Sequence, residues 1–166
     1  MRNIILVLVI LYGCDQPNKD ADDFFNSANE KFKNAEYESA IKDYNKAIQI
    51  DPEYIVAYSG RGVCKYSIED YRGAIKDFSM AIEKDPDYLM GYVERGLTRL
   101  KIKDYRKAVK DFTKAIEIDP NYAFSYKVRG DLKKDLGYRN DACLDWYKAK
   151  ERGNRKASEL IEENCD

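Results

Sequence analysis

The chain has 166 residues, and its 29 lysines and arginines nearly balance its 30 aspartates and glutamates. This balance argues against the basic surface with which proteins bind nucleic acids through the phosphates, so no nucleic-acid partner is expected. The chain contains no histidine, which removes the commonest general base of enzymes and the commonest zinc ligand.

The N-terminal residues differ in composition from the rest of the chain. An apolar run extends from Ile4 to Leu11 after a single arginine; it is too short to span a membrane but suits the centre of a secretory signal. The tetrapeptide ending in Gly13-Cys14 resembles the lipobox of bacterial lipoproteins, in which cleavage precedes a cysteine that then carries lipid. We expect a lipoprotein signal peptide over residues 1–13 and lipidation of Cys14. The alternative is an ordinary signal peptide in which Cys14 has no role.

Residues 14–22 would then comprise the lipidated cysteine and a polar tether to the folded part of the chain. Two or more acyl chains hold a protein on a membrane durably, whereas one chain binds only marginally. The expected location is the bacterial cell envelope, with the chain lipid-anchored to a membrane on its periplasmic side or at the outer surface.

From residue 21 onward the sequence repeats itself every 34 residues. The apolar positions of each copy recur at helical spacing, and a proline stops a helix or opens the next one. The copies span residues 21–54, 55–88, 89–122 and 123–156. The clearest columns are Ala47, Ala81, Ala115 and Ala149; Tyr44, Phe78, Phe112 and Trp146; and Pro52, Pro86 and Pro120.

These columns resemble those of the tetratricopeptide repeat family, whose unit is a helix–turn–helix. The family's small residue at position 8 is Ala28, Gly62, Gly96 and Gly130 here, whereas its usual tryptophan at position 4 is replaced by Phe24, Tyr58, Tyr92 and Tyr126. The resemblance implies an all-α fold, a right-handed α-solenoid of four repeats over residues 23–156 with a C-terminal capping helix over residues 157–166. One hairpin cannot bury its apolar face alone, so stacked copies share a continuous core and leave a concave surface.

Four cysteines stand at positions 14, 64, 143 and 165. Cys143 and Cys165 lie on two helices that fold back on each other about Gly153, so a disulfide between them is geometrically allowed; the alternative is two small buried thiols. Cys64 is expected to be a core residue with a free thiol. No metal site is expected, because the chain has neither a histidine nor a close pair of cysteines.

The resemblance also implies where a partner would bind. In the family, the first helix of each repeat lines the concave surface, and the matching positions form a largely apolar set, which suits a peptide or a helix. The predicted partner-binding groove consists of Phe25, Asn29, Phe32, Val56, Ser59, Val63, Tyr66, Met90, Val93, Leu97, Leu100, Phe124 and Lys127.

Some family members grip a C-terminal carboxylate of heat-shock chaperones with a clamp of basic residues and asparagines. Only one of the five clamp positions matches here, so this mechanism is not expected; those positions read Phe25, Asn29, Gly60, Met90 and Glu94. A column of arginines at positions 61, 95 and 129 is expected to pair with nearby acids such as Glu69, Glu94 or Asp131 rather than to bind an anion. The Lys-Asp runs are expected to be solvated helix faces.

The resulting hypothesis is a membrane-anchored scaffold that binds a protein or peptide in the cell envelope. No catalytic motif supports an enzyme, since the chain has no nucleophile elbow, phosphate-binding loop or isolated carboxylate pair, and no cofactor is expected. The alternative is an accessory lipoprotein that binds glycan or cell wall through its aromatic residues. Most of those aromatic residues, however, occupy core positions of the family.

Overall fold

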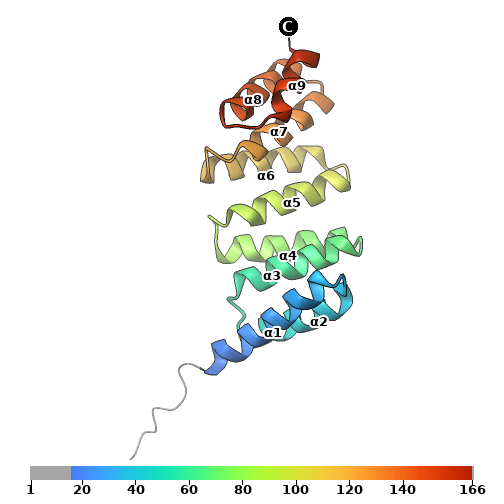
Figure 1. Ribbon diagram of the computed structural model, residues 1–166, viewed down its shortest axis with the longest axis vertical. Helices are drawn as coiled ribbons and strands as arrows, with labels where there is room; N and C mark the ends of the chain where they lie inside the picture. The colour runs from blue at the N-terminus through green and yellow to red at the C-terminus, as the bar shows by residue number, and fades with distance from the viewer. Residues whose placement is uncertain (1–15, 166) are drawn as a thin grey trace, which may run out of the picture.

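The computed structural model describes residues 16–165, which form nine α-helices and contain no strand. The helices stack in chain order along one axis, from α1 and α2 at one end to α8 and α9 at the other (Figure 1). Their bounds are α1 Gln16–Lys33, α2 Tyr37–Ile50, α3 Ile55–Ser67, α4 Tyr71–Lys84, α5 Leu89–Lys101, α6 Tyr105–Ile118, α7 Ala123–Asp135, α8 Arg139–Glu151 and α9 Lys156–Asn164.

Each helix pair is delimited by residues that the sequence repeats. The second helices α2, α4 and α6 all end two residues before a proline, which cannot donate the next helical hydrogen bond. In the turn inside each pair one residue has a positive φ, and in the last pair this residue is Gly137, at φ 87°. Glycine adopts that conformation without strain, whereas the equivalent residues of the first three pairs are Ala35, Glu69 and Lys103.

The core is built from the repeated small and aromatic residues. The aromatic residue of each second helix is fully buried against the first helix of its own repeat. At Gly62, an added Cβ atom would lie 2.7 Å from the ring of Phe78, so the glycine is what lets helix and ring approach this closely. The equivalent position of the other repeats also has a small residue, which leaves room for a ring. Tyr44, Phe112 and Trp146 are accordingly at most 2% exposed.

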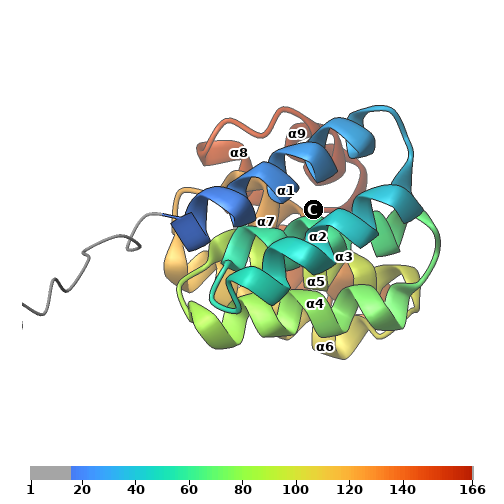
Figure 2. The same ribbon diagram turned by 90° about the horizontal axis from the view of Figure 1, so that it is seen from below.

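The stacking gives the molecule an inner and an outer side. Consecutive helices pack against each other along the whole array, and the first helices of successive repeats also touch, α1 against α3 and α3 against α5. Because these first helices lie closest together, they are on the concave side of the curve, and the second helices lie behind them. Figure 2 views the stack of helices from below, along its long axis. The fold is therefore the expected α-solenoid.

Two of the expected boundaries were wrong. Helix α1 begins at Gln16, so most of the residues assigned to a polar tether over 14–22 are helical. Proline at position 17 is compatible with a first helical turn, and Ala21 is 1% exposed because it packs into the core. At the other end, α9 stops at Asn164, and Cys165 has an extended backbone instead of belonging to the capping helix.

The expected signal peptide over residues 1–13 and the expected lipidation of Cys14 lie outside the described residues. Within the described part, none of the helices combines the length and the apolar character needed to cross a membrane.

Candidate functional site

The candidate site is the inner face, which we define as the concave-side residues of α1, α3, α5 and α7. Its most accessible apolar side chains occupy the second position of three successive first helices. Val56 is 40% exposed, Met90 38% and Phe124 37%. These residues are 34 apart in sequence, so they form a row that crosses α3, α5 and α7.

Two of the residues assigned to the groove are not available to a partner. Ser59 is 8% exposed and Val93 is 2% exposed. Val93 packs in a core cluster with Ala108 and Phe112, which shows that its position on α5 faces the second helix of its own repeat. Their assignment to the groove was therefore wrong.

The other apolar residues assigned to the groove are half-buried, each with one edge open. Phe25 packs against Tyr54 with ring centroids 5.0 Å apart, and Tyr66 packs edge-on against Tyr71 at 5.5 Å. The core clusters beneath the inner face are also contacted by three partly buried side chains, those of Phe32, Leu97 and Leu100. Because neighbouring side chains hold these groups in place, the inner face is a pre-formed apolar surface.

The inner face is hollowed between the first two repeats. A cavity of about 180 Å³ is lined by Asn29, Phe32, Tyr44, Gly60 and Val63. The Tyr44 hydroxyl donates a 2.5 Å hydrogen bond to Asn29 Oδ1 in its wall. Burial raises the pKa of Tyr44 to about 12, so this hydroxyl stays protonated near neutral pH.

One carboxylate on the inner face has an unusual environment. Glu94 is half-buried on α5, one turn from Met90 and one turn from Leu97. Burial raises its pKa above the ordinary glutamate value. Among the described residues, no ion pair or hydrogen bond to its carboxylate compensates for that loss of hydration.

The last repeat gives the inner face a charged end. Lys127 forms a 2.6 Å ion pair with Asp131, whose other oxygen accepts a 3.0 Å hydrogen bond from the Trp146 indole. Lys127 is thus half-buried and already paired in the isolated chain.

A second set of charges lies behind the inner face and holds the repeats together. A buried aspartate on each second helix pairs with basic residues on the first helix of the same repeat, with two of them in the second, third and fourth repeats and with one, Lys31, in the first. Asp111, for example, accepts from Arg95 at 2.8 Å and from Arg99 at 2.6 Å. The equivalent aspartates are Asp43, Asp77 and Asp145.

Three of the four arginines in this set, those at positions 61, 95 and 129, also bridge successive repeats. Each of them donates to the second helix of the repeat before it, as Arg95 does to Ser79 Oγ at 3.0 Å. Arg61 and Arg129 make the equivalent contacts to Asn45 and Thr113. The arginine column therefore has the expected structural role, but the expected partners Glu69, Glu94 and Asp131 were wrong.

At the first repeat the same network has a different composition. Asp43 lies there between Lys31, at 2.5 Å, and the Ser27 hydroxyl, at 2.7 Å. Burial raises the pKa of Asp43, but the hydrogen bonds from Lys31 and Ser27 outweigh it, so the pKa lies below the ordinary aspartate value.

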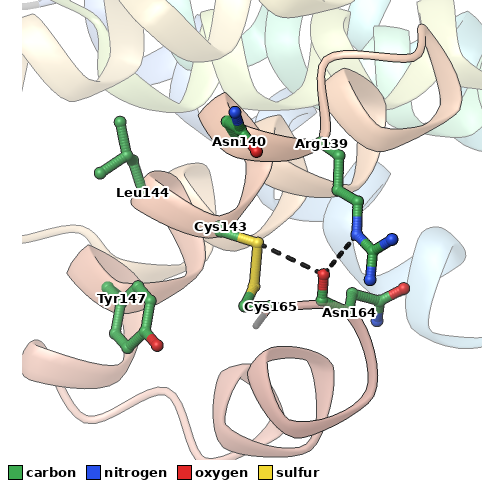
Figure 3. Close-up of a pocket in the computed structure, with 7 residues that line it drawn as sticks. All are labelled: Arg139, Asn140, Cys143, Leu144, Tyr147, Asn164 and Cys165. Atoms are coloured by element: carbon green, nitrogen blue, oxygen red, sulfur yellow. Dashed lines mark hydrogen bonds between the residues drawn. A yellow bond between two sulfur atoms is a disulfide. The ribbon is translucent and has the colours of Figure 1, made fainter.

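A larger cavity lies at the C-terminal end, away from the inner face. It measures about 440 Å³ and is lined by residues of α8 and by Asn164 and Cys165. Figure 3 shows the disulfide between Cys143 and Cys165 in its wall, and the Arg139 side chain donating to the Asn164 carbonyl at 2.6 Å. The two cysteine Cα atoms are 5.8 Å apart. The disulfide therefore ties the end of α9 to α8.

The remaining titratable groups offer little chemistry. Cys64 is buried, and burial raises its pKa to about 11, which keeps it a thiol. Among the described residues, no three side chains of the kinds that bind metals are gathered in one place.

Comparisons with known proteins agree with this architecture. Two family models match the chain, one described as TPR repeat over residues 28–68 and one as Tetratricopeptide repeat over residues 90–122. A 39-residue segment is 44% identical to Stress-induced-phosphoprotein 1 of Caenorhabditis elegans, and it covers 24% of this chain and 12% of that protein. The chain thus matches only a small part of that relative's length.

Several solved structures share the fold. The crystal structure of MamA has a TM-score of 0.78 at 24% identity and covers 86% of this chain and 83% of its own. The first TPR of Spaghetti (RPAP3), bound to the HSP90 peptide SRMEEVD, has a TM-score of 0.70 at 23% identity and covers 72% and 95%. MamA 41-end from Desulfovibrio magneticus RS-1 has a TM-score of 0.73 at 17% identity and covers 80% and 75%. At these identities the likeness concerns the fold.

The groove prediction did not include two features of the inner face. The groove prediction contained neither Gly60 nor Tyr44, although both line the cavity between the first two repeats. It also contained no acid, although Glu94 lies among its apolar residues. The sequence does mark both features at one position of the repeat, because the sixth position differs in chemistry from copy to copy. The residues at that position are Asn26, Gly60, Glu94 and Val128.

Proposed function

Because this chain belongs to the tetratricopeptide repeat family, we propose that it is a scaffold that holds a segment of another protein on its inner face. The observation that carries this proposal is the row of accessible apolar side chains at Val56, Met90 and Phe124. An apolar row on a rigid concave surface is suited to a helix or an extended peptide.

One solved neighbour supports peptide binding as the mode. The first TPR of Spaghetti (RPAP3) is bound to the HSP90 peptide SRMEEVD, which carries three acidic residues. In this chain the basic positions of the chaperone clamp are occupied by Phe25, Met90 and Glu94. We therefore infer a peptide partner of a different chemistry, bound on the same side of the solenoid.

The second part of the proposal concerns location. The apolar run Ile4–Leu11 and the tetrapeptide that ends at Cys14 support a lipid anchor in the bacterial cell envelope. The scaffold would then hold its partner at a membrane. If so, Cys14→Ser moves the protein from the membrane fraction to the soluble fraction, and continued membrane association of this variant contradicts anchoring through Cys14.

The binding proposal is tested by site-specific photocrosslinking in the native cell. A photoreactive amino acid at Met90, on the inner face, should form a discrete adduct with one partner. The same amino acid at Lys76, which is exposed on α4, is the matched control and should form none. Adducts of equal yield at both positions would mean that the inner face is not the binding surface.

A further inference from the structure

The side chain at the sixth position of each repeat determines which partner side chains the inner face can accept. In the second repeat this position is Gly60, and an added Cβ atom there would lie 2.6 Å from the Tyr44 ring. With no side chain at position 60, the space above Tyr44 remains open as the cavity of about 180 Å³. In the third and fourth repeats the same position carries Glu94 and Val128, and Val128 packs in the core cluster that contains Phe112.

The cavity has the size and lining of a subsite for one aliphatic side chain. Its volume is below the roughly 300–1,000 Å³ of pockets that take a whole small molecule. Phe32, Val63 and the Tyr44 ring provide apolar walls, and the Tyr44 hydroxyl is already bonded to Asn29. A leucine-like side chain would gain by burial there without breaking a hydrogen bond.

Glu94 provides the second element, because it is a half-buried carboxylate without a counter-charge. The neighbouring cations on α5 are engaged elsewhere, since Arg95 and Arg99 both pair with Asp111 on the side away from the inner face. Lys127 of the next first helix pairs with Asp131. Around Glu94 the inner face offers Met90 and Leu97, which are apolar. A carboxylate in this setting is complementary to a cation that a partner brings.

The two elements lie on adjacent first helices. Gly60 on α3 and Glu94 on α5 occupy equivalent positions, and α3 and α5 are in contact. Packed helices lie roughly 8–10 Å apart, which an extended peptide spans in about three residues.

We propose that the inner face selects a basic and aliphatic peptide segment, in which one aliphatic side chain enters the Gly60 cavity and a lysine or arginine about three residues away pairs with Glu94. This inference rests on the proposed peptide-binding function and gives the partner its chemistry.

The test uses the full chain and arrays of twelve-residue synthetic peptides. Each peptide has one fixed leucine and one lysine placed within four residues on either side, in a background of glycine, serine and alanine. Companion arrays replace the lysine by glutamine or glutamate, or the leucine by serine. We expect at least about tenfold tighter binding of the best leucine–lysine peptide than of its glutamate counterpart, and weaker binding of the serine counterpart.

Two variants with matched controls assign these preferences to the site. Glu94→Gln should abolish the preference for lysine over glutamine, whereas Glu83→Gln, at an exposed site on α4, should leave it unchanged. Val63→Phe should fill the cavity and abolish the preference for leucine over serine, whereas Leu144→Phe, at an exposed site on α8 away from the inner face, should not. If circular dichroism shows that Val63→Phe does not fold, the proposal is tested by the lysine preference of Glu94→Gln alone.

The outcomes separate this inference from the function on which it rests. Peptide binding that ignores charge, or a lysine preference that survives in Glu94→Gln, overturns the inference and leaves the scaffold function standing. The absence of binding to any array, together with a Met90 crosslink in the cell, has the same meaning. If the arrays and the crosslink both fail, the scaffold function itself is overturned.

Discussion

Glu94 is a residue that the fold tolerates but does not need. Burial raises its pKa, so the folded chain binds the proton of this carboxyl group more tightly than the unfolded chain does. The stability contributed by that difference is present below the ordinary glutamate pKa of 4.5 and is lost as the pH rises through the folded value. At neutral pH the ionised side chain therefore weakens the fold.

We predict that Glu94→Gln increases the free energy of unfolding at pH 7, because the amide is less costly to bury than the carboxylate. The increase should shrink toward zero as the pH is lowered past 4.5. Urea unfolding followed by circular dichroism measures both values, with Glu83→Gln as the control at an exposed site. A loss of stability at pH 7 would show that the Glu94 carboxylate already has a stabilising partner.

In contrast to Glu94, the buried aspartates are expected to stabilise the fold. Asp111 is the shared partner of Arg95 and Arg99, so Asp111→Asn leaves two desolvated guanidinium groups without a counter-charge. Removing one partner of a buried ion pair costs roughly 3–5 kcal/mol, and we predict a loss of this size in urea unfolding. The control is Asp87→Asn, in an exposed turn, which should change stability by less than about 0.5 kcal/mol. Equal effects of the two substitutions would contradict the role given to the buried network.

These aspartates also show where sequence reasoning fails at the scale of single residues. The Lys-Asp runs were expected to be solvated helix faces, and the lysines at positions 42, 76 and 110 are indeed exposed. The aspartate that follows each lysine is instead buried and paired with an arginine 16 or a lysine 12 positions earlier. Such pairs depend on how two helices dock, which the charge pattern of one helix does not specify.

At the scale of elements, the end of the array depends on a covalent link. Helix α9 has nine residues and buries only Ala157 and Ile161, which is little apolar area to hold it in place. The disulfide between Cys143 and Cys165 closes a segment with a sequence separation of 22 residues. The disulfide lowers the conformational entropy of the unfolded chain, and it therefore stabilises the docking of α9 on α8 in addition to the contacts between the two helices.

We predict that the pair Cys143→Ser and Cys165→Ser lowers the free energy of unfolding of the oxidised protein by about 3 kcal/mol, from the loop-closure estimate for this separation. Hydrogen exchange should accelerate most in α8 and α9, while α1–α4 stay protected. Adding a reductant to the unsubstituted chain should reproduce the effect. An unchanged exchange pattern in α8 and α9 would mean that the disulfide is dispensable for the cap.

Element boundaries were predictable where the repeat marks them and not elsewhere. The starts of α3, α5 and α7 coincide with the predicted copy boundaries at residues 55, 89 and 123, because prolines and aromatic columns repeat there. Helix α1 has no preceding copy, so no column indicated that it begins at Gln16. The groove prediction failed in a similar way at Ser59 and Val93, because family positions do not state how deeply a given side chain is buried.

At the scale of the molecule, stability should be local. Each repeat contacts its neighbours and little else, so a solenoid behaves as a chain of units coupled to nearest neighbours. We predict that Phe112→Ala, which removes a fully buried ring between α5 and α6, costs roughly 3–5 kcal/mol. Hydrogen exchange should increase in α5–α8 and fade toward α1 and α2. Uniform acceleration over all helices would instead indicate one cooperative globule.

The central claim is that the inner face, and neither the outer helices nor the C-terminal cavity, is where this chain holds its partner. It is tested most directly by recording amide chemical shifts of the isotope-labelled chain while the tightest-binding peptide of the arrays is added. The account predicts that the largest shifts fall on α3 and α5, at Gly60, Val63, Glu94 and Leu97. Shifts concentrated on α4 and α6, or on the cavity around Cys143, would contradict it.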